Sequence, residues 1–155
     1  MIAGLVLRDV HSDDLPILFE HQRDPVAIRM AGYRPRSLEA FREHWEKILR
    51  DPSVIKLAVI WNEEVAGNMV VFDVGENRAV GYWLGNTYWG KGIATSALAE
   101  LLQRVLERPL FAYVAAHNVG SQRVLEKCGF VSLGGVDTPE GFDPLVGEEL
   151  LMRLD

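Results

Sequence analysis

The sequence predicts an α/β fold, with one mixed, largely antiparallel sheet and helices packed on its two faces. Three observations support this prediction. The 155 residues suit a single domain. Their apolar periodicities follow the order β-α-α-β-β-β-α-β-α-β-β. The run at residues 110–116 is apolar on both faces, which is typical of a central strand.

The N-terminal third is expected to form one strand and two helices. Residues 5–10 form the strand. Because Pro16 is best tolerated in the first turn of a helix, Ser12 or Asp13 is the expected N-cap of the first helix. No clear period follows until Ser37, which caps the second helix. The apolar stripe of that helix consists of Leu38, Phe41, Trp45, Ile48 and Leu49.

The rest of the chain is expected to form six strands and two more helices. Three strands on short turns come first, and such a meander favours antiparallel pairing. One helix precedes the central strand, one helix follows it, and two strands close the chain. The strands lie at residues 55–61, 65–74, 79–84, 110–116, 130–136 and 146–154, and the helices at residues 93–106 and 118–127.

Composition and charge restrict the class of protein. A net charge of −6 argues against a broad basic face for nucleic acid. No apolar run approaches the ~20 residues that a membrane-spanning helix needs. The single cysteine, Cys128, excludes an intrachain disulfide and is compatible with a reducing compartment. We therefore expect a soluble, cytoplasmic domain with no nucleic-acid or membrane partner.

A glycine-rich turn at residues 85–95 is the main candidate for a binding site. It leads from a strand into a helix, and the free backbone N–H groups at a helix N-terminus bind phosphate-type anions. Gly85-x4-Gly90-Lys91-Gly92 is close to a P-loop, but a P-loop has Ser or Thr after the lysine to hold Mg²⁺. Gly92 at that place argues against an NTPase.

Two sequence blocks resemble the GNAT superfamily of N-acetyltransferases. The block Trp89-Gly90-Lys91-Gly92-Ile93-Ala94 fits the (Arg/Gln)-x-x-Gly-x-(Gly/Ala) turn of that family, with Trp89 in the Arg/Gln place. The longer phrase from Gly81 to Thr95 is similar to the ribosomal-protein N-terminal acetyltransferase (RimJ/RimL-type) branch. The block Asn118-x-x-Ser121 up to Gly129-Phe130 resembles the family's segment after the fifth strand. The resemblance implies that residues 1–155 form a single GNAT acetyltransferase domain, with the fourth and fifth strands splayed.

The resemblance also implies acetyl-CoA as cosubstrate, without a metal. Gly90 and Gly92 would let the backbone approach the CoA pyrophosphate without side-chain obstruction. A backbone N–H at the end of the fourth strand would face the thioester carbonyl and stabilise its oxyanion. The alternative is that these glycines only form a turn and the tryptophans belong to the core. The expected cofactor-binding residues are Trp83, Leu84, Trp89, Gly90, Lys91, Gly92, Ile93, Ala94, Thr95 and Asn118.

Ser121 is the catalytic residue that the resemblance suggests. It lies on the inward stripe of its helix, and its hydroxyl would protonate the departing thiolate, whose conjugate acid has a pKa of ~8.5. The alternative roles are an ordinary first-turn residue for Ser121 and a simple N-cap for Asn118. No general base is assigned, because the strand at residues 79–84 has no acid and His117 is as well explained by packing. Cys128 is interpreted as a small core residue.

The acceptor is expected to be a primary amine, on a peptide N-terminus or a small molecule, that attacks directly in a ternary complex. In the family, the segment between the first two helices and the loop before the last strand border the acceptor. An acidic rim on that loop would concentrate a cationic amine, and a solvated loop is the alternative. A non-catalytic acyl-CoA-binding or regulatory module of the same fold, another acyl-CoA and a homodimer paired through the last strands all stay open. The acidic residues are Asp137, Glu140, Asp143, Glu148 and Glu149, and the first segment carries Arg29, Arg34 and Arg36.

Overall fold

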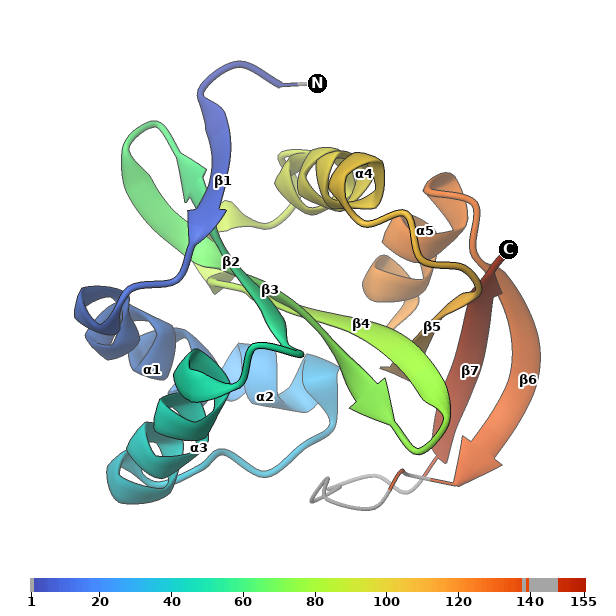
Figure 1. Cartoon of the computed structure of the whole chain (residues 1–155), viewed down its shortest axis with the longest axis horizontal. Helices are drawn as coiled ribbons and strands as arrows, with labels where there is room; N and C mark the ends of the chain where they lie inside the picture. Colours follow the sequence, from blue (N-terminus) through green and yellow to red (C-terminus); the bar gives the residue numbers. More distant parts are fainter. Residues whose placement is uncertain (1, 138, 140–147) are drawn as a thin grey trace.

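A computed structural model confirms the predicted α/β architecture, and it describes residues 2–137, 139 and 148–155. Its strands are β1 (Leu5–Asp9), β2 (Ile55–Trp61), β3 (Glu64–Val74), β4 (Asn77–Leu84), β5 (Leu110–Ala115), β6 (Val131–Asp137) and β7 (Glu148–Leu154). Its helices are α1 (Leu15–Arg23), α2 (Pro25–Ala31), α3 (Leu38–Arg50), α4 (Ile93–Arg104) and α5 (Val119–Lys127). The strands form one sheet in the order β1-β2-β3-β4-β5-β7-β6. Helices α1, α2 and α3 lie on one side of this sheet, and α4 and α5 lie on the other (Figure 1).

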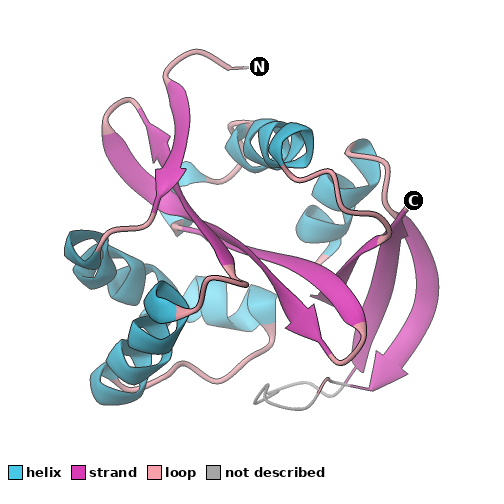
Figure 2. Ribbon diagram, viewed as in Figure 1, coloured by secondary structure: helices cyan, strands magenta, loops and turns pink. Residues whose placement is uncertain are grey.

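The sheet opens between β4 and β5. Every other neighbouring pair of strands is antiparallel, whereas β4 and β5 run parallel. Among the described residues, their register contains one pair, Ala79 with Phe111. Figure 2 shows the strands of the sheet with helices on both of its sides. The remaining backbone edge of β4 therefore has no strand partner on its β5 side, as the predicted splay requires.

Alternation along the strands divides the core into two layers. The larger layer packs α4 and α5 against the sheet and includes Leu98, Leu101 and Leu125. The smaller layer packs α1 and α3 against the other face through Leu18 and Trp45. None of the helices in the described part of the chain has the length and apolar character that a membrane crossing requires.

Helix α2 lies in the segment for which the sequence shows no clear period. Asp24 caps it by accepting a hydrogen bond from the N–H of Val26, at 3.1 Å. Gly32 ends it in the left-handed conformation, with φ of 77°. Its start and stop signals are therefore ordinary, but seven residues are too short for a helical period to stand out.

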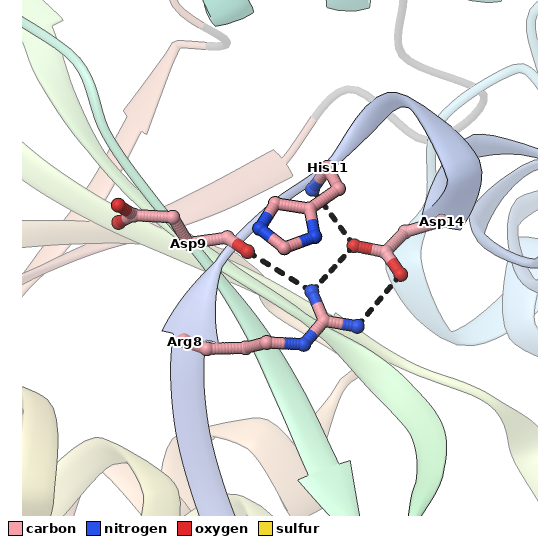
Figure 3. A network of polar contacts seen from close by, with 4 residues as sticks. All are labelled: Arg8, Asp9, His11 and Asp14. Carbon is pink, nitrogen blue, oxygen red and sulfur yellow. Dashed lines mark hydrogen bonds and ion pairs between the residues drawn. The ribbon is translucent and has the colours of Figure 1, made fainter.

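The cap predicted for the first helix is wrong, whereas Ser37 caps α3 as predicted. Ser12–Asp14 form a 3₁₀ turn before α1, and Asp14 lies at the junction. The Asp14 carboxylate accepts two hydrogen bonds from Arg8, at 2.7 and 2.8 Å, and one from the N–H of His11, at 2.8 Å (Figure 3). The hydrogen bond from Arg8 holds the pKa of Asp14 below its usual value. This network joins β1 to the start of α1.

Candidate functional site

The glycine turn presents backbone rather than side chains. Gly90 and Gly92 have φ of 74° and 79°, a region that favours glycine. A Cβ built on either residue would meet nothing within 4 Å, so both Cα atoms face open space. Gly92 is the N-cap of α4 and supplies no side-chain cap, which leaves the first N–H groups of the helix to bind an anion.

Two tryptophan side chains anchor the turn and the strand that precedes it. The indole N–H of Trp89 donates to the carbonyl of Leu84, at 3.1 Å, and that of Trp83 donates to the carbonyl of His21 in α1, at 3.1 Å. Trp89 is 37% exposed, so it is not a core residue. A Cβ at Gly85 would lie 2.8 Å from the His21 ring, which explains the glycine there.

A cavity of about 460 Å³ brings the predicted site together. The predicted residues that line it are Trp83, Leu84, Trp89, Gly90, Gly92, Ile93, Ala94, Thr95, Asn118 and Ser121. Lys91 does not line it, because its ammonium lies 6.0 Å from the ring centre of Trp61. The cavity thus extends from the glycine turn to the helix that carries the candidate acid.

Several lining residues were missed by the sequence analysis. Arg123 and Lys127 lie one turn apart on α5, and their positive charges could face phosphate groups in the cavity. The signal in the sequence was a pair of basic residues, four positions apart, in the helix that begins with Asn118-x-x-Ser121. Helix α2 adds Ala27, Met30 and Ala31 to the opposite wall, and Tyr82 and Tyr88 also line the cavity.

Ser121 is held by hydrogen bonds to Asn118 and Tyr82. Its backbone N–H donates to Oδ1 of Asn118 at 3.1 Å, so Asn118 is the N-cap of α5. Its hydroxyl oxygen lies 2.7 Å from the phenol oxygen of Tyr82 on β4. Burial raises the pKa of Tyr82 to about 12, against the opposing effect of the Ser121 hydrogen bond. Two hydroxyl groups therefore meet at the cavity wall.

The residues considered as base or nucleophile have other contacts. Nε2 of His117 lies 2.6 Å from the carbonyl oxygen of Arg29, which links the end of β5 to α2. The thiol of Cys128 packs partly buried against the main core and donates to the carbonyl of Thr95, at 3.7 Å. Burial raises the pKa of that thiol, which disfavours its nucleophilic form. These contacts agree with a packing role for both residues.

Among the described acidic residues of the predicted rim, one does not fit the prediction. Glu149 is 1% exposed and accepts a hydrogen bond from the Tyr33 hydroxyl, so it is not a solvated rim residue. Burial raises the pKa of its carboxyl group. Asp137 and Glu148 are exposed and face each other across β6 and β7. Glu140 and Asp143 lie outside the described residues.

Comparison with protein families agrees with this architecture. A family model described as "Acetyltransferase (GNAT) domain" matches residues 4–131, which include the glycine turn and the α5 segment. The comparison with curated proteins found no match.

Solved acetyltransferase structures share the fold over nearly the whole chain. A spermidine N-acetyltransferase from Vibrio cholerae, in complex with CoA and spermine, is 17% identical with a TM-score of 0.82, over 99% of this chain and 96% of the other. An aminoglycoside acetyltransferase in complex with coenzyme A is 21% identical with a TM-score of 0.79, over 97% and 94%. RimL, a ribosomal alpha-N-protein acetyltransferase in complex with coenzyme A, is 18% identical with a TM-score of 0.79, over 99% and 94%.

Proposed function

This chain belongs to the GNAT acetyltransferase domain family and is an acetyl-CoA-dependent N-acetyltransferase; we propose that its acceptor is a primary amine on a small molecule or a peptide N-terminus. The observation that carries the proposal is the cavity itself. It joins the bare glycine turn, the open edge of β4 and Ser121 in one space bounded on the far side by α2. A cosubstrate and an acceptor could therefore bind next to each other in this one cavity.

The chain's own groups suggest how CoA would lie. The pyrophosphate would bind the N–H groups at the start of α4, with Arg123 and Lys127 near its other phosphate oxygens. The pantetheine arm would enter between β4 and β5 and pair with the unpaired edge of β4. The thioester carbonyl would then accept from a backbone N–H near Trp83 or Leu84.

Acetyl transfer would proceed by direct attack in a ternary complex. The amine nitrogen bonds to the thioester carbon, the oxyanion is stabilised by the β4 backbone, and the carbon–sulfur bond then breaks. The nitrogen loses two protons to solvent, one before attack and one after it, while the leaving sulfur takes one proton from a neighbouring donor that is then reprotonated from solvent. Ser121 is positioned to supply the proton to the sulfur.

Two observations support an amine as the acceptor, one from the similar proteins and one from this chain. The similar structures named above are acetyltransferases of a polyamine, of aminoglycosides and of a ribosomal protein, and all these acceptors carry amines. In this chain, the exposed carboxylates of Asp137 and Glu148 would attract a cationic acceptor. The similarity to RimL is one among several, so the proposed acceptors include both a peptide N-terminus and a small-molecule amine.

A mass-spectrometric screen tests the proposal. The purified protein is incubated with acetyl-CoA and, separately, with polyamines, aminoglycosides and peptides that have a free N-terminus. We expect a 1:1 increase in free CoA thiol and acetylated amine for at least one class. The matched control is the same peptide with its N-terminus already acetylated, which should give no product. CoA binding without acetyl transfer to any amine would instead favour a non-catalytic acyl-CoA-binding module.

A further inference from the structure

Tyr82 reaches the candidate acid from the opposite side of the opening in the sheet. Successive side chains of β4 point to opposite faces, so Tyr82 and Trp83 diverge. Trp83 hydrogen-bonds to α1, whereas Tyr82 packs with the core beneath α4 and α5. The phenol therefore extends to α5 from β4, which borders the gap in which the pantetheine arm would lie.

The Tyr82–Ser121 contact forms a chain of two hydroxyl groups. The phenol oxygen lies 2.7 Å from the Ser121 hydroxyl oxygen, where either group can donate, and the phenol can also donate to the Ser121 carbonyl oxygen, at 3.2 Å. When the phenol donates to the Ser121 hydroxyl, the serine proton is free to point into the cavity. Both residues line that cavity, so the open end of the chain faces the substrate space.

We propose that Tyr82 is a proton donor in acetyl transfer, and that its proton reaches the CoA sulfur through the Ser121 hydroxyl. This inference rests on the acetyl transfer proposed above. As the carbon–sulfur bond breaks, its electron pair stays on sulfur, and the sulfur takes the Ser121 proton. The Tyr82 proton moves to the Ser121 oxygen in the same step, and the resulting phenolate regains a proton from solvent.

The chemical reason is the mismatch between a serine hydroxyl and a thiolate. A lone serine would be left as an alkoxide, which is a far stronger base than the thiolate it protonates. Moving the phenol proton at the same time leaves a phenolate, because a phenol is much more acidic than an aliphatic hydroxyl. Proton transfer is most effective when donor and acceptor are matched in acidity. With Tyr82 as the final donor, the acidities of the donor and of the CoA thiol are closer than with serine alone.

The surroundings of the pair carry few competing charges. On α5, the Cys128 thiol lies close enough to influence Tyr82, and Arg123 and Lys127 line the same cavity. The cavity-lining residues at the start of α4, Ile93 to Thr95, cannot ionise. On β5, the side chains on this face are those of the apolar core. The phenol is therefore the titratable group in direct contact with Ser121 in the described structure.

Single-turnover kinetics of Tyr82→Phe test the relay against a matched control. We expect the rate of acetyl transfer to fall roughly 10- to 100-fold, which is within the range for loss of a general acid. CoA affinity should stay within about threefold of wild type. Ser121→Ala should lose a similar factor, and the double variant should be no slower than the slower single variant, because the two groups act in one chain. The control is Tyr113→Phe on β5, which also removes a phenol hydroxyl, here hydrogen-bonded to Asn77, outside the cavity.

Two further measurements distinguish a proton relay from a purely structural role of Tyr82. In mixtures of H₂O and D₂O, two moving protons should give a curved dependence of the wild-type rate, and Tyr82→Phe should give a straight line. In the complex with CoA alone, the pKa of the CoA thiol should be lower in wild type than in Tyr82→Phe, as read from thiolate absorbance. An unchanged single-turnover rate in Tyr82→Phe, or loss of CoA binding as its only effect, would overturn the relay.

The thiol titration needs no acceptor, so it separates this inference from the proposed function. A Tyr82-dependent pKa of the bound thiol, without acetylation of any amine, would support the donor pair and contradict the amine acceptor. Efficient acetylation that does not depend on Tyr82 would support the function and contradict the relay.

Discussion

Placing a carboxylate on the glycine turn should weaken CoA binding on the order of 100-fold while leaving the fold intact. Gly92 faces the cavity, and a Cβ there meets no protein atom within 4 Å. Gly92→Asp therefore puts its new charge into the space that the pyrophosphate would occupy. The same substitution at Gly75 is a matched control, because that residue also has a positive φ, of 59°, and open space around its Cβ, but lies outside the cavity lining.

The expected loss of affinity follows from electrostatics. One negative charge at about 5 Å from another, at an effective dielectric constant of about 20, costs about 3 kcal/mol. That corresponds to an increase in Kd on the order of 100-fold. The cost of a non-glycine residue at positive φ, about 1–2 kcal/mol, should appear in the stability of both variants alike. Affinity and stability are thus separable.

Isothermal titration with CoA and thermal unfolding measure the two quantities. We expect Gly92→Asp to lose CoA affinity, and to regain part of it at high ionic strength because salt screens the repulsion. Gly92→Ala should lose less, since it adds bulk without charge. Gly75→Asp should bind CoA like wild type although its melting temperature falls by a similar amount. Normal CoA affinity in Gly92→Asp would refute the assignment of the pyrophosphate to this turn.

Two other predictions concern the acceptor side and the N-terminal ion pair. Asp137→Lys should raise the acceptor KM severalfold in steady-state kinetics, with little change in kcat. The control, Glu43→Lys on the exposed face of α3, should leave that KM unchanged. Equal acceptor KM values in Asp137→Lys and wild type would rule out an acidic rim. Asp14→Asn should lower stability by about 1–2 kcal/mol at neutral pH, because it breaks a largely buried pair with the partly exposed Arg8. Since the folded pKa of Asp14 is lowered, its stabilisation is present above the unfolded pKa of ~3.9 and lost as pH falls through the folded pKa. The stabilities of the two proteins in urea unfolding should therefore begin to converge as the pH falls below about 4 and meet below the folded pKa of Asp14, and a gap independent of pH would contradict the ion-pair explanation.

Local chemistry explains why the backbone of the glycine turn could be predicted. Positive φ at Gly90 and Gly92, the bare N-terminus of α4 and the Asn118 cap each depend on a few neighbouring residues. The strand order could be predicted for a similar reason, because short turns restrict which strands can pair. Even α2 had its signals, in Asp24 and Gly32, although its few residues hid the period.

Contacts between distant residues were decided by the tertiary structure alone. The two-residue period of β4 requires Tyr82 and Trp83 to face opposite ways, but only the packing of α5 decides which of them meets Ser121, 39 residues away. Glu149 is acidic and belongs to a stretch of sequence rich in acidic residues, yet it is buried and accepts a hydrogen bond from Tyr33, 116 residues away. The sequence by itself thus determined the fold class and the backbone conformation of the glycine turn, because turns and caps are local. Tertiary packing decided which hydroxyl groups share the cavity and which carboxylate is withdrawn from solvent, because burial depends on residues far apart in the chain.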